Sequence, residues 1–98
     1  MSYTRLNPKP TLDIAFESVS SPSVSISSGS WGDATATIPE KTGYTPIGVA
    51  RVELGSPSSL TLIGFNMSSD VVKARMRNMT SSSGSWGAIF TIAYAKVS

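Results

Sequence analysis

Apolar and polar residues alternate along most of this chain with a repeat of two positions. A period of two is typical of a half-buried β-strand, because successive side chains point to opposite faces of a sheet. The alternation, or a short apolar run, recurs in seven segments: 12–17, 23–27, 34–38, 49–54, 60–66, 72–77 and 89–95. No segment carries apolar residues at helical spacing over three turns. The pattern predicts about seven strands and no substantial helix.

Serine, glycine, proline and asparagine separate these segments. The clusters lie at 20–22, 29–33, 41–46, 55–59, 68–70 and 80–85, and these residue types favour turns. Short strands at such intervals predict an antiparallel β-sandwich, jelly-roll or immunoglobulin-like. Residues 1–10, with Pro8 and Pro10, predict an extended N-terminal arm. Residues 11–98 are expected to form one domain, because the chain is too short for two independent cores.

The alternation also predicts which side chains face the core. Two apolar triplets should do so: Leu12, Ile14 and Phe16 in one segment, and Ala50, Val52 and Leu54 in another. The last segment, 89–95, is apolar on both of its faces. An antiparallel strand with one solvated face would not show this pattern, so the strand is either central and covered on both faces or has a second face that meets another subunit. For so small a chain we expect the subunit contact.

The low charge of the chain argues against partners that are themselves highly charged. Only 14% of the residues are charged, against roughly 25% in an average domain. The net charge of +2 is too small to indicate a nucleic-acid or membrane partner. The chain has no cysteine, so disulfides cannot add stability to a core this small, and we expect a homo-oligomer.

The N-terminal sequence and the hydropathy bear on localisation. No run of 18 apolar residues occurs, so no membrane span is expected. The polar start, MSYTRLNPKP, lacks the apolar core of a secretory signal. We therefore expect synthesis in the cytoplasm, followed by retention there or assembly into a particle, unless the chain was cut from a longer protein.

The residue inventory argues against catalysis. The absence of histidine excludes a Ser-His-Asp triad and a histidine metal site. A glycosidase needs only two carboxylates, but none of the six here lies in a recognisable catalytic motif. They are Asp13, Glu17, Asp33, Glu40, Glu53 and Asp70. We expect no enzyme, no cofactor and no metal.

Three cations, Lys73, Arg75 and Arg77, alternate along one strand and project to the same face. A β-ribbon that contacts phosphates would place cations in this way. No aromatic residue is interleaved to stack on bases, however. The sequence favours a solvated face, or cross-strand pairing with residues such as Glu53, over a nucleic-acid site.

Two triplets, Asn66-Met67-Ser68 and Asn78-Met79-Thr80, match the pattern for N-linked glycosylation. Such triplets arise easily in a chain rich in serine and threonine. Asparagine also tolerates turn geometry. We interpret both triplets as the starts of hairpin turns.

The hexapeptide SSGSWG occurs at 27–32 and again at 82–87, and it contains both tryptophans. We interpret it as one local turn used at two strand entries, with each tryptophan covering the core or a subunit contact. The alternative is a glycan platform, since the apolar faces of sugar rings stack on indole. Its residues would be Trp31, Trp86 and Tyr44, with Asp33 and Arg51 as polar partners.

The stretch GYTPIGV at 43–49, followed by an apolar strand, resembles a segment of tail-fibre and minor structural proteins of tailed bacteriophages. There it belongs to a small C-terminal β-domain. The later segment KARMRN, a serine-rich turn and the closing YAKVS are similar as well. The resemblance implies a virion or prophage-encoded module, usually trimeric, that caps a tail or contacts host glycans or proteins.

Three hypotheses therefore remain open. A phage tail-type module predicts a trimer in which the second apolar face of the last strand is buried. A bacterial carbohydrate-binding module predicts a monomer with exposed tryptophans. A β-ribbon nucleic-acid binder predicts salt-sensitive binding that is lost when Lys73, Arg75 and Arg77 are neutralised.

Overall fold

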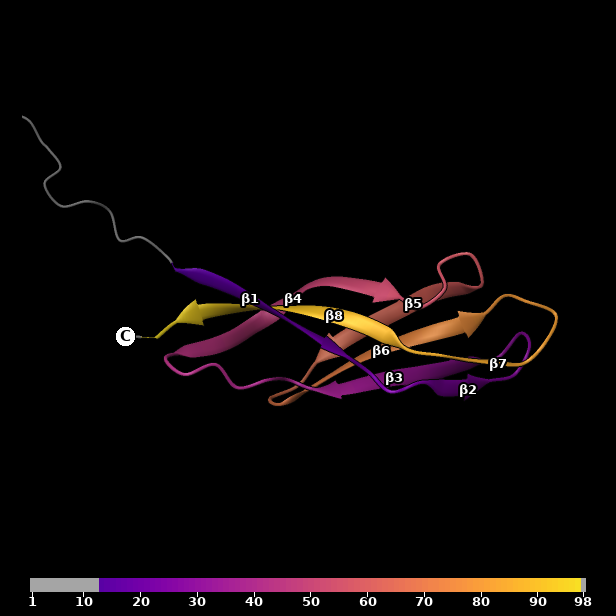
Figure 1. Ribbon diagram of the computed structural model, residues 1–98, viewed down its shortest axis with the longest axis horizontal. Helices are drawn as coiled ribbons and strands as arrows, with labels where there is room; N and C mark the ends of the chain where they lie inside the picture. Colours follow the sequence, from indigo (N-terminus) through magenta and orange to yellow (C-terminus); the bar gives the residue numbers. More distant parts are fainter. Residues whose placement is uncertain (1–12, 98) are drawn as a thin grey trace, which may run out of the picture.

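The computed structural model describes residues 13–97 as an all-β, antiparallel protein (Figure 1). Its eight strands are β1 (Ile14–Ser20), β2 (Val24–Ile26), β3 (Trp31–Thr37), β4 (Tyr44–Leu54), β5 (Leu60–Met67), β6 (Val71–Asn78), β7 (Gly84–Trp86) and β8 (Ala88–Lys96). The all-β class predicted from the alternation is confirmed. The strand count differs from seven because a short strand, β7, forms within the serine-rich segment that was expected to be a turn.

The strands form three sheets, ordered β1-β8-β4, β3-β6-β5 and β2-β7. The two-stranded ribbon lies at the end of the molecule away from the C-terminal end of β8 (Figure 1). The arm predicted for residues 1–10 lies outside the described residues. No helix in the described part of the chain is long and apolar enough to cross a membrane.

The core lies between the inner faces of the two three-stranded sheets. β6 contributes Val72, Ala74 and Met76, all fully buried, as its alternation predicts. From the other sheet, β8 contributes Phe90 and Ile92. Further buried apolar side chains in the same cluster are Ile26, Ala34, Ala36, Ile38, Leu60, Ala88 and Tyr94. One continuous core therefore holds the two sheets together.

The face predicted for β1 is wrong. Phe16 is 57% exposed, whereas Val19 and Glu17 lie opposite the buried residues Phe90 and Ile92 of β8. The pairing register thus turns the apolar Ile14 and Phe16 away from the core. Glu17 is tolerated on the inner side because β1 is an edge strand, where Lys41 Nζ reaches Glu17 Oε2 at 3.0 Å.

The face predicted for β4 is partly wrong for a different reason. The register against β8 shifts between Pro46 and Gly48, and again between Val49 and Arg51. The second shift leaves Ala50 as an exposed bulge residue and brings Val49 opposite the buried Ile92. After the bulge, Val52 and Leu54 pack against the core as predicted. An inserted residue changes the face of every residue beyond it, which a strict alternation cannot anticipate.

Candidate functional site

The outer face of the β3-β6-β5 sheet brings an aromatic residue, a carboxylate and three cations together. Directly paired residues of two antiparallel strands project to the same side of the sheet. Trp31 of β3 is paired with Arg77 of β6, and Asp33 with Arg75. Lys73 is the next residue on the same side of β6. We call these five residues the Trp31 face.

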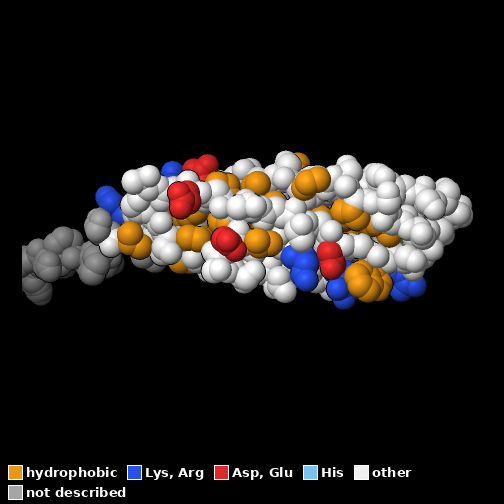
Figure 2. All heavy atoms as spheres, turned by 90° about the horizontal axis from the view of Figure 1, so that it is seen from below, with side chains coloured by type: hydrophobic (Ala, Val, Ile, Leu, Met, Phe, Trp, Pro, Cys, Tyr) orange, Lys and Arg blue, Asp and Glu red, His pale blue; other side chains and the backbone are white. Residues whose placement is uncertain are grey.

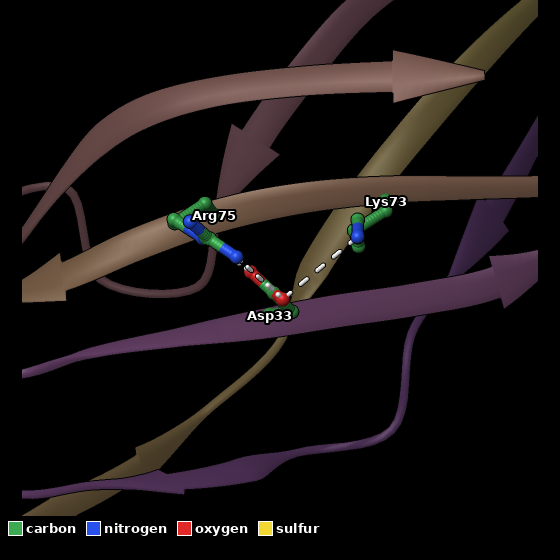
Figure 3. A network of polar contacts seen from close by, with 3 residues as sticks. All are labelled: Asp33, Lys73 and Arg75. Carbon is green, nitrogen blue, oxygen red and sulfur yellow. Dashed lines mark hydrogen bonds and ion pairs between the residues drawn. The ribbon is translucent and has the colours of Figure 1, made fainter.

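Arg75 holds the centre of the Trp31 face in one arrangement. Its Nε donates a hydrogen bond to Asp33 Oδ1 at 2.9 Å, and its Nη2 donates to Asp33 Oδ2 at 3.2 Å. The guanidinium carbon lies 3.7 Å from the centre of the Trp31 ring. Figure 3 shows Asp33 of β3 between Arg75 and Lys73 of β6, with Lys73 Nζ 4.0 Å from Oδ2. A two-pronged ion pair that also stacks on indole fixes both planar groups.

The Trp31 face stays charged at neutral pH. The hydrogen bonds from Arg75 lower the pKa of Asp33, and the positive charges of Arg75 and Lys73 lower it further against the opposing effect of burial. The same hydrogen bonds raise the pKa of Arg75. Arg77 donates from Nε to the Gly29 carbonyl at 3.1 Å and forms no ion pair with the described residues. Three cations therefore face one carboxylate.

A shallow hollow of about 280 Å³ adjoins the Trp31 face. Lys73 and Arg75 form one wall, and Ile63, Gly64, Phe65 and Asn66 of β5 form the other. Ile63 and Phe65 are each about half exposed. Figure 2 views the molecule from below and shows blue, red and orange side chains adjoining in one group, with other charged and apolar side chains along the rest of this surface. Four charged side chains thus adjoin one indole on this face, while the ion pairs of Lys41, Arg51 and Lys96 lie elsewhere on the molecule.

A second hollow, of about 420 Å³, lies elsewhere, where β3 and β5 end and β4 begins. Its lining residues are Ile38, Pro39, Glu40, Lys41, Thr42, Tyr44, Pro46, Ser69 and Asp70. Lys41 Nζ lies 5.1 Å from the centre of the Tyr44 ring, and the same group pairs with Glu17. The Tyr94 hydroxyl donates to the Pro39 carbonyl at 2.6 Å, and burial raises the pKa of Tyr94. This hollow mixes both signs of charge, and its cation is already paired.

The structure does not bring the five predicted platform residues together. Trp31 and Asp33 lie side by side on the Trp31 face, and Trp31 is 54% exposed. Tyr44 lines the second hollow, and Trp86 is half-buried against the core. Arg51 lies on the other three-stranded sheet, where its Nη2 meets Glu53 Oε2 at 2.9 Å.

The predicted partner of the basic strand is also corrected. Lys73 and Arg75 pair with Asp33, whereas Glu53 pairs with Arg51. The physical reason is the sheet order, which places β6 beside β3 and β4 in the other sheet.

The two SSGSWG segments adopt different structures, so their interpretation as one repeated turn is wrong. In the first, Gly29 has a φ of +74° inside a turn, and Trp31 begins β3. In the second, Gly84 has no positive φ and begins β7, which pairs with β2. The pairing partner, not the hexapeptide, determines the local conformation.

The sequence did not predict that the basic residues of β6 lie beside Trp31. The contact between Arg75 and Asp33 spans 42 positions, and pairing between such distant strands leaves no local signal. Opposite charges were visible, since the segment 72–77 holds three cations and Asp33 directly precedes the alternating segment 34–38, which holds no charge. That complementarity is the feature from which the pairing could have been suggested.

The described residues hold no group of three carboxylates that could bind a metal ion. The chain matches no family model, no curated protein and no solved structure.

Proposed function

We propose that this chain is a non-enzymatic structural and host-recognition module of a phage or prophage tail-type particle. It would be a two-layer β-sandwich that acts as a homotrimer. The two sheets that share one core support the sandwich. The observation that carries the functional proposal is an exposed apolar surface on the outer side of the β1-β8-β4 sheet.

We call this surface the Phe16 face and define it by Ile14, Phe16, Ile47, Ala93 and Ala95. The register pairs Ile14 with Ala95 and Phe16 with Ala93, so these four side chains share one side of the sheet. Ile14 is 40% exposed, Phe16 57% and Ile47 52%. A contiguous exposed apolar patch is typical of a protein–protein interface. It is also the second apolar face of the last strand, for which the sequence predicted a subunit contact.

The segment with the phage-like sequence contributes to this surface. Gly43 has a φ of +84°, a value that side-chain-bearing residues rarely adopt, and it makes the turn that leads into β4. Ile47 then lies at the first register shift of β4, where its side chain is exposed. The stretch at 43–49 thus presents an apolar side chain rather than filling the core, which suits a segment used for assembly.

The Phe16 face and the Trp31 face lie on the outer sides of two different sheets. Association through the Phe16 face would leave the Trp31 face open to a ligand. Three such weak sites on a repetitive cell surface gain about 10²–10⁴ in affinity over one site. The arrangement therefore fits a particle component that assembles with one sheet and contacts the host with the other.

A monomeric carbohydrate-binding module is the second candidate. The 54% exposure of Trp31 favours it, because an exposed indole is a platform for a sugar ring. The two candidates differ in the fate of the Phe16 face, which a monomer would leave in water.

Size-exclusion chromatography with light scattering distinguishes them. We expect a molar mass of three times 10.3 kDa for the wild type. A double variant, Phe16→Ser with Ala93→Asp, should shift to the monomer mass, because it places a polar group and a charge in the proposed interface. Thr37→Asp, an exposed position on the other sheet, is the matched control and should remain a trimer. A monomeric wild type would contradict the tail-module proposal in favour of the carbohydrate-binding module.

A further inference from the structure

We infer that the Trp31 face binds an acidic polysaccharide, with Lys73 and Arg77 contacting two of its carboxylates and Trp31 stacking on a sugar ring between them. This deepens the proposed host-recognition function and rests on it. The proposed function rests on the Phe16 face, which gives no information on the ligand; the Trp31 face indicates its chemical class.

The cations available to a ligand are the outer two of the three. Arg75 donates two hydrogen bonds to Asp33, and the face of its guanidinium stacks on the Trp31 ring. The Lys73 side chain is 42% exposed, and its Nζ lies 4.0 Å from Asp33 Oδ2, which is the distance limit of an ion pair. Arg77 is exposed, and among the described residues its side chain bonds only to a backbone carbonyl. Four residues apart on one strand, Lys73 and Arg77 lie about 13 Å from each other at 3.3–3.4 Å per residue.

Trp31 is held ready for a flat ligand. Its ring is stacked on the guanidinium of Arg75, whose own position is fixed by Asp33. Trp31 still exposes 54% of its surface beside Arg77, with which it is directly paired. A ring that is already ordered loses little conformational entropy on binding, so a stacked sugar gains affinity from preorganisation.

The hollow at β5 provides room next to the charged row. It holds about 280 Å³ and lies against Lys73 and Arg75, with Asn66 and Ile63 on its far wall. The Asn66 amide can both donate to and accept from sugar hydroxyls. Ile63 offers an apolar surface to the carbon face of a sugar ring.

Asp33 favours a polysaccharide over a nucleic acid. Its carboxylate lies in the middle of the cationic row and stays ionised, because Arg75 lowers its pKa. A phosphodiester chain brings closely spaced negative charges and would be repelled there. A glycan with widely spaced carboxylates can place hydroxyl donors over Asp33 instead. Non-specific binding of single-stranded nucleic acid also uses several stacking aromatics, and the Trp31 face has one.

Calorimetric titration of the full chain tests the inference with defined probes. The acidic probes are oligosaccharides of galacturonate, alginate and hyaluronan, the neutral probe is a malto-oligosaccharide, and the nucleic acid is oligo-dT. We expect an acidic probe to bind in preference to the neutral one, and to bind more weakly as salt is added because the charges are screened. Lys73→Gln with Arg77→Gln should weaken this binding at least about tenfold, and so should Trp31→Ala.

The matched control is Arg51→Gln with Lys96→Gln, which removes the same two charges from the other sheet. It should bind as the wild type does, and circular dichroism should show that every variant retains its strands. If it weakens binding as much as the Lys73 and Arg77 changes do, the attraction is non-specific and the inference fails.

Other outcomes separate this inference from the proposed function. Equal binding of neutral and acidic probes, unchanged by Lys73→Gln with Arg77→Gln, would overturn the acidic class and leave glycan recognition standing. Tighter binding of oligo-dT would overturn it in favour of a nucleic acid. Absence of binding to all three acidic probes at about 1 mM, where even weak sites are occupied, would also overturn it. The light-scattering mass tests trimer assembly independently of all three results.

Discussion

At the scale of single residues, Asn78 links two serine-rich loops by hydrogen bonds: the loop between β2 and β3 and the loop between β6 and β7. It is fully buried, and its side-chain Nδ2 donates to the carbonyls of Ile26 at 3.0 Å and Ser82 at 2.9 Å. Its Oδ1 accepts from both the backbone N–H and the hydroxyl of Thr80, at 2.8 Å and 2.7 Å. Every donor and acceptor of the amide is therefore used, which explains why asparagine stands here at the end of β6.

Asn78→Ala should lower the free energy of unfolding by about 2–4 kcal/mol, because it removes the hydrogen bonds that the buried amide makes to Ile26, Thr80 and Ser82. The matched control is Asn66→Ala, an exposed asparagine in the same kind of triplet, which should cost less than about 0.5 kcal/mol. Urea denaturation followed by tryptophan fluorescence at one protein concentration measures both. Equal losses for the two variants would show that Asn78 is not the tie between these loops.

The ionisation of Asp33 also makes the stability of the fold depend on pH. Its pKa in the folded protein lies below the ordinary value of 3.8, chiefly because of the hydrogen bonds from Arg75. Between the two values the unfolded chain binds a proton that the folded chain does not. The ion pair thus contributes its full stability above about pH 5, and loses it as the pH falls through the folded pKa.

The acid limb of the stability curve should therefore be shallower in Asp33→Asn than in the wild type. Asp70→Asn removes an exposed carboxylate with no ion pair among the described residues and is the control for the loss of one negative charge. Unfolding free energies measured from pH 7 down to about pH 2 give the comparison. Identical slopes for the wild type and Asp33→Asn would contradict the role assigned to the Arg75 hydrogen bonds.

At the scale of elements, the short β2-β7 ribbon depends on one close contact. The ring of Trp86 covers Gly84 on the same strand, and a methyl group added at Gly84 would lie 2.6 Å from Trp86 Cζ2. The ring would have to leave its place against the core. The glycine of the second SSGSWG segment is thus required by a neighbouring side chain, not by a left-handed backbone.

Gly84→Ala should displace Trp86, alter the near-ultraviolet circular dichroism and cost about 1–3 kcal/mol of stability. Gly64→Ala, in β5, is the control, because a methyl group there meets no atom within 4 Å, and its effect should stay within about 0.5 kcal/mol. An unchanged aromatic spectrum in Gly84→Ala would show that the ring does not depend on this glycine.

The elements also differ in how far the sequence predicts them. β6 is a central strand paired on both sides, so its alternation maps directly onto core and surface. β1 is an edge strand whose register turns Phe16 outward, because Lys41 can pair with an inward Glu17 there. β4 is interrupted by an extra residue at Ala50. Alternation reports that a strand exists, whereas register and bulges depend on contacts with strands far along the chain.

The candidate site follows the same rule. Trp31 and Asp33 could be named from the sequence, because both stand out by residue type in the cluster 29–33. Their contact with Lys73, Arg75 and Arg77 could not be predicted, because it depends on the pairing of β3 with β6. Local chemistry is visible in the sequence, but the assembly of a site from two strands requires the sheet order.

At the scale of the whole molecule, a small cysteine-free core is combined with an exposed apolar sheet face. Each large apolar side chain that an interface covers contributes about 1.5–3 kcal/mol. A chain of this size gains much from such cover, because so little of its surface is otherwise buried. Folding and association should therefore be linked.

The apparent melting temperature should rise with protein concentration over an about 100-fold range, since mass action favours the proposed trimer over the unfolded monomer. Phe16→Ser with Ala93→Asp should melt at a temperature independent of concentration. Scanning calorimetry at several concentrations measures both. A wild-type melting temperature that does not vary would contradict the linkage.

The pairing of β1 with β8 places Ile14 directly opposite Ala95, at one end of the molecule (Figure 1). The hydrogen bonds between antiparallel strands run perpendicular to the strands. A force that pulls these two positions apart acts along those bonds and loads only the outermost pair at any moment. Mechanical tension there would therefore open the domain like a zipper, one residue pair after another, rather than by shearing a whole strand at once.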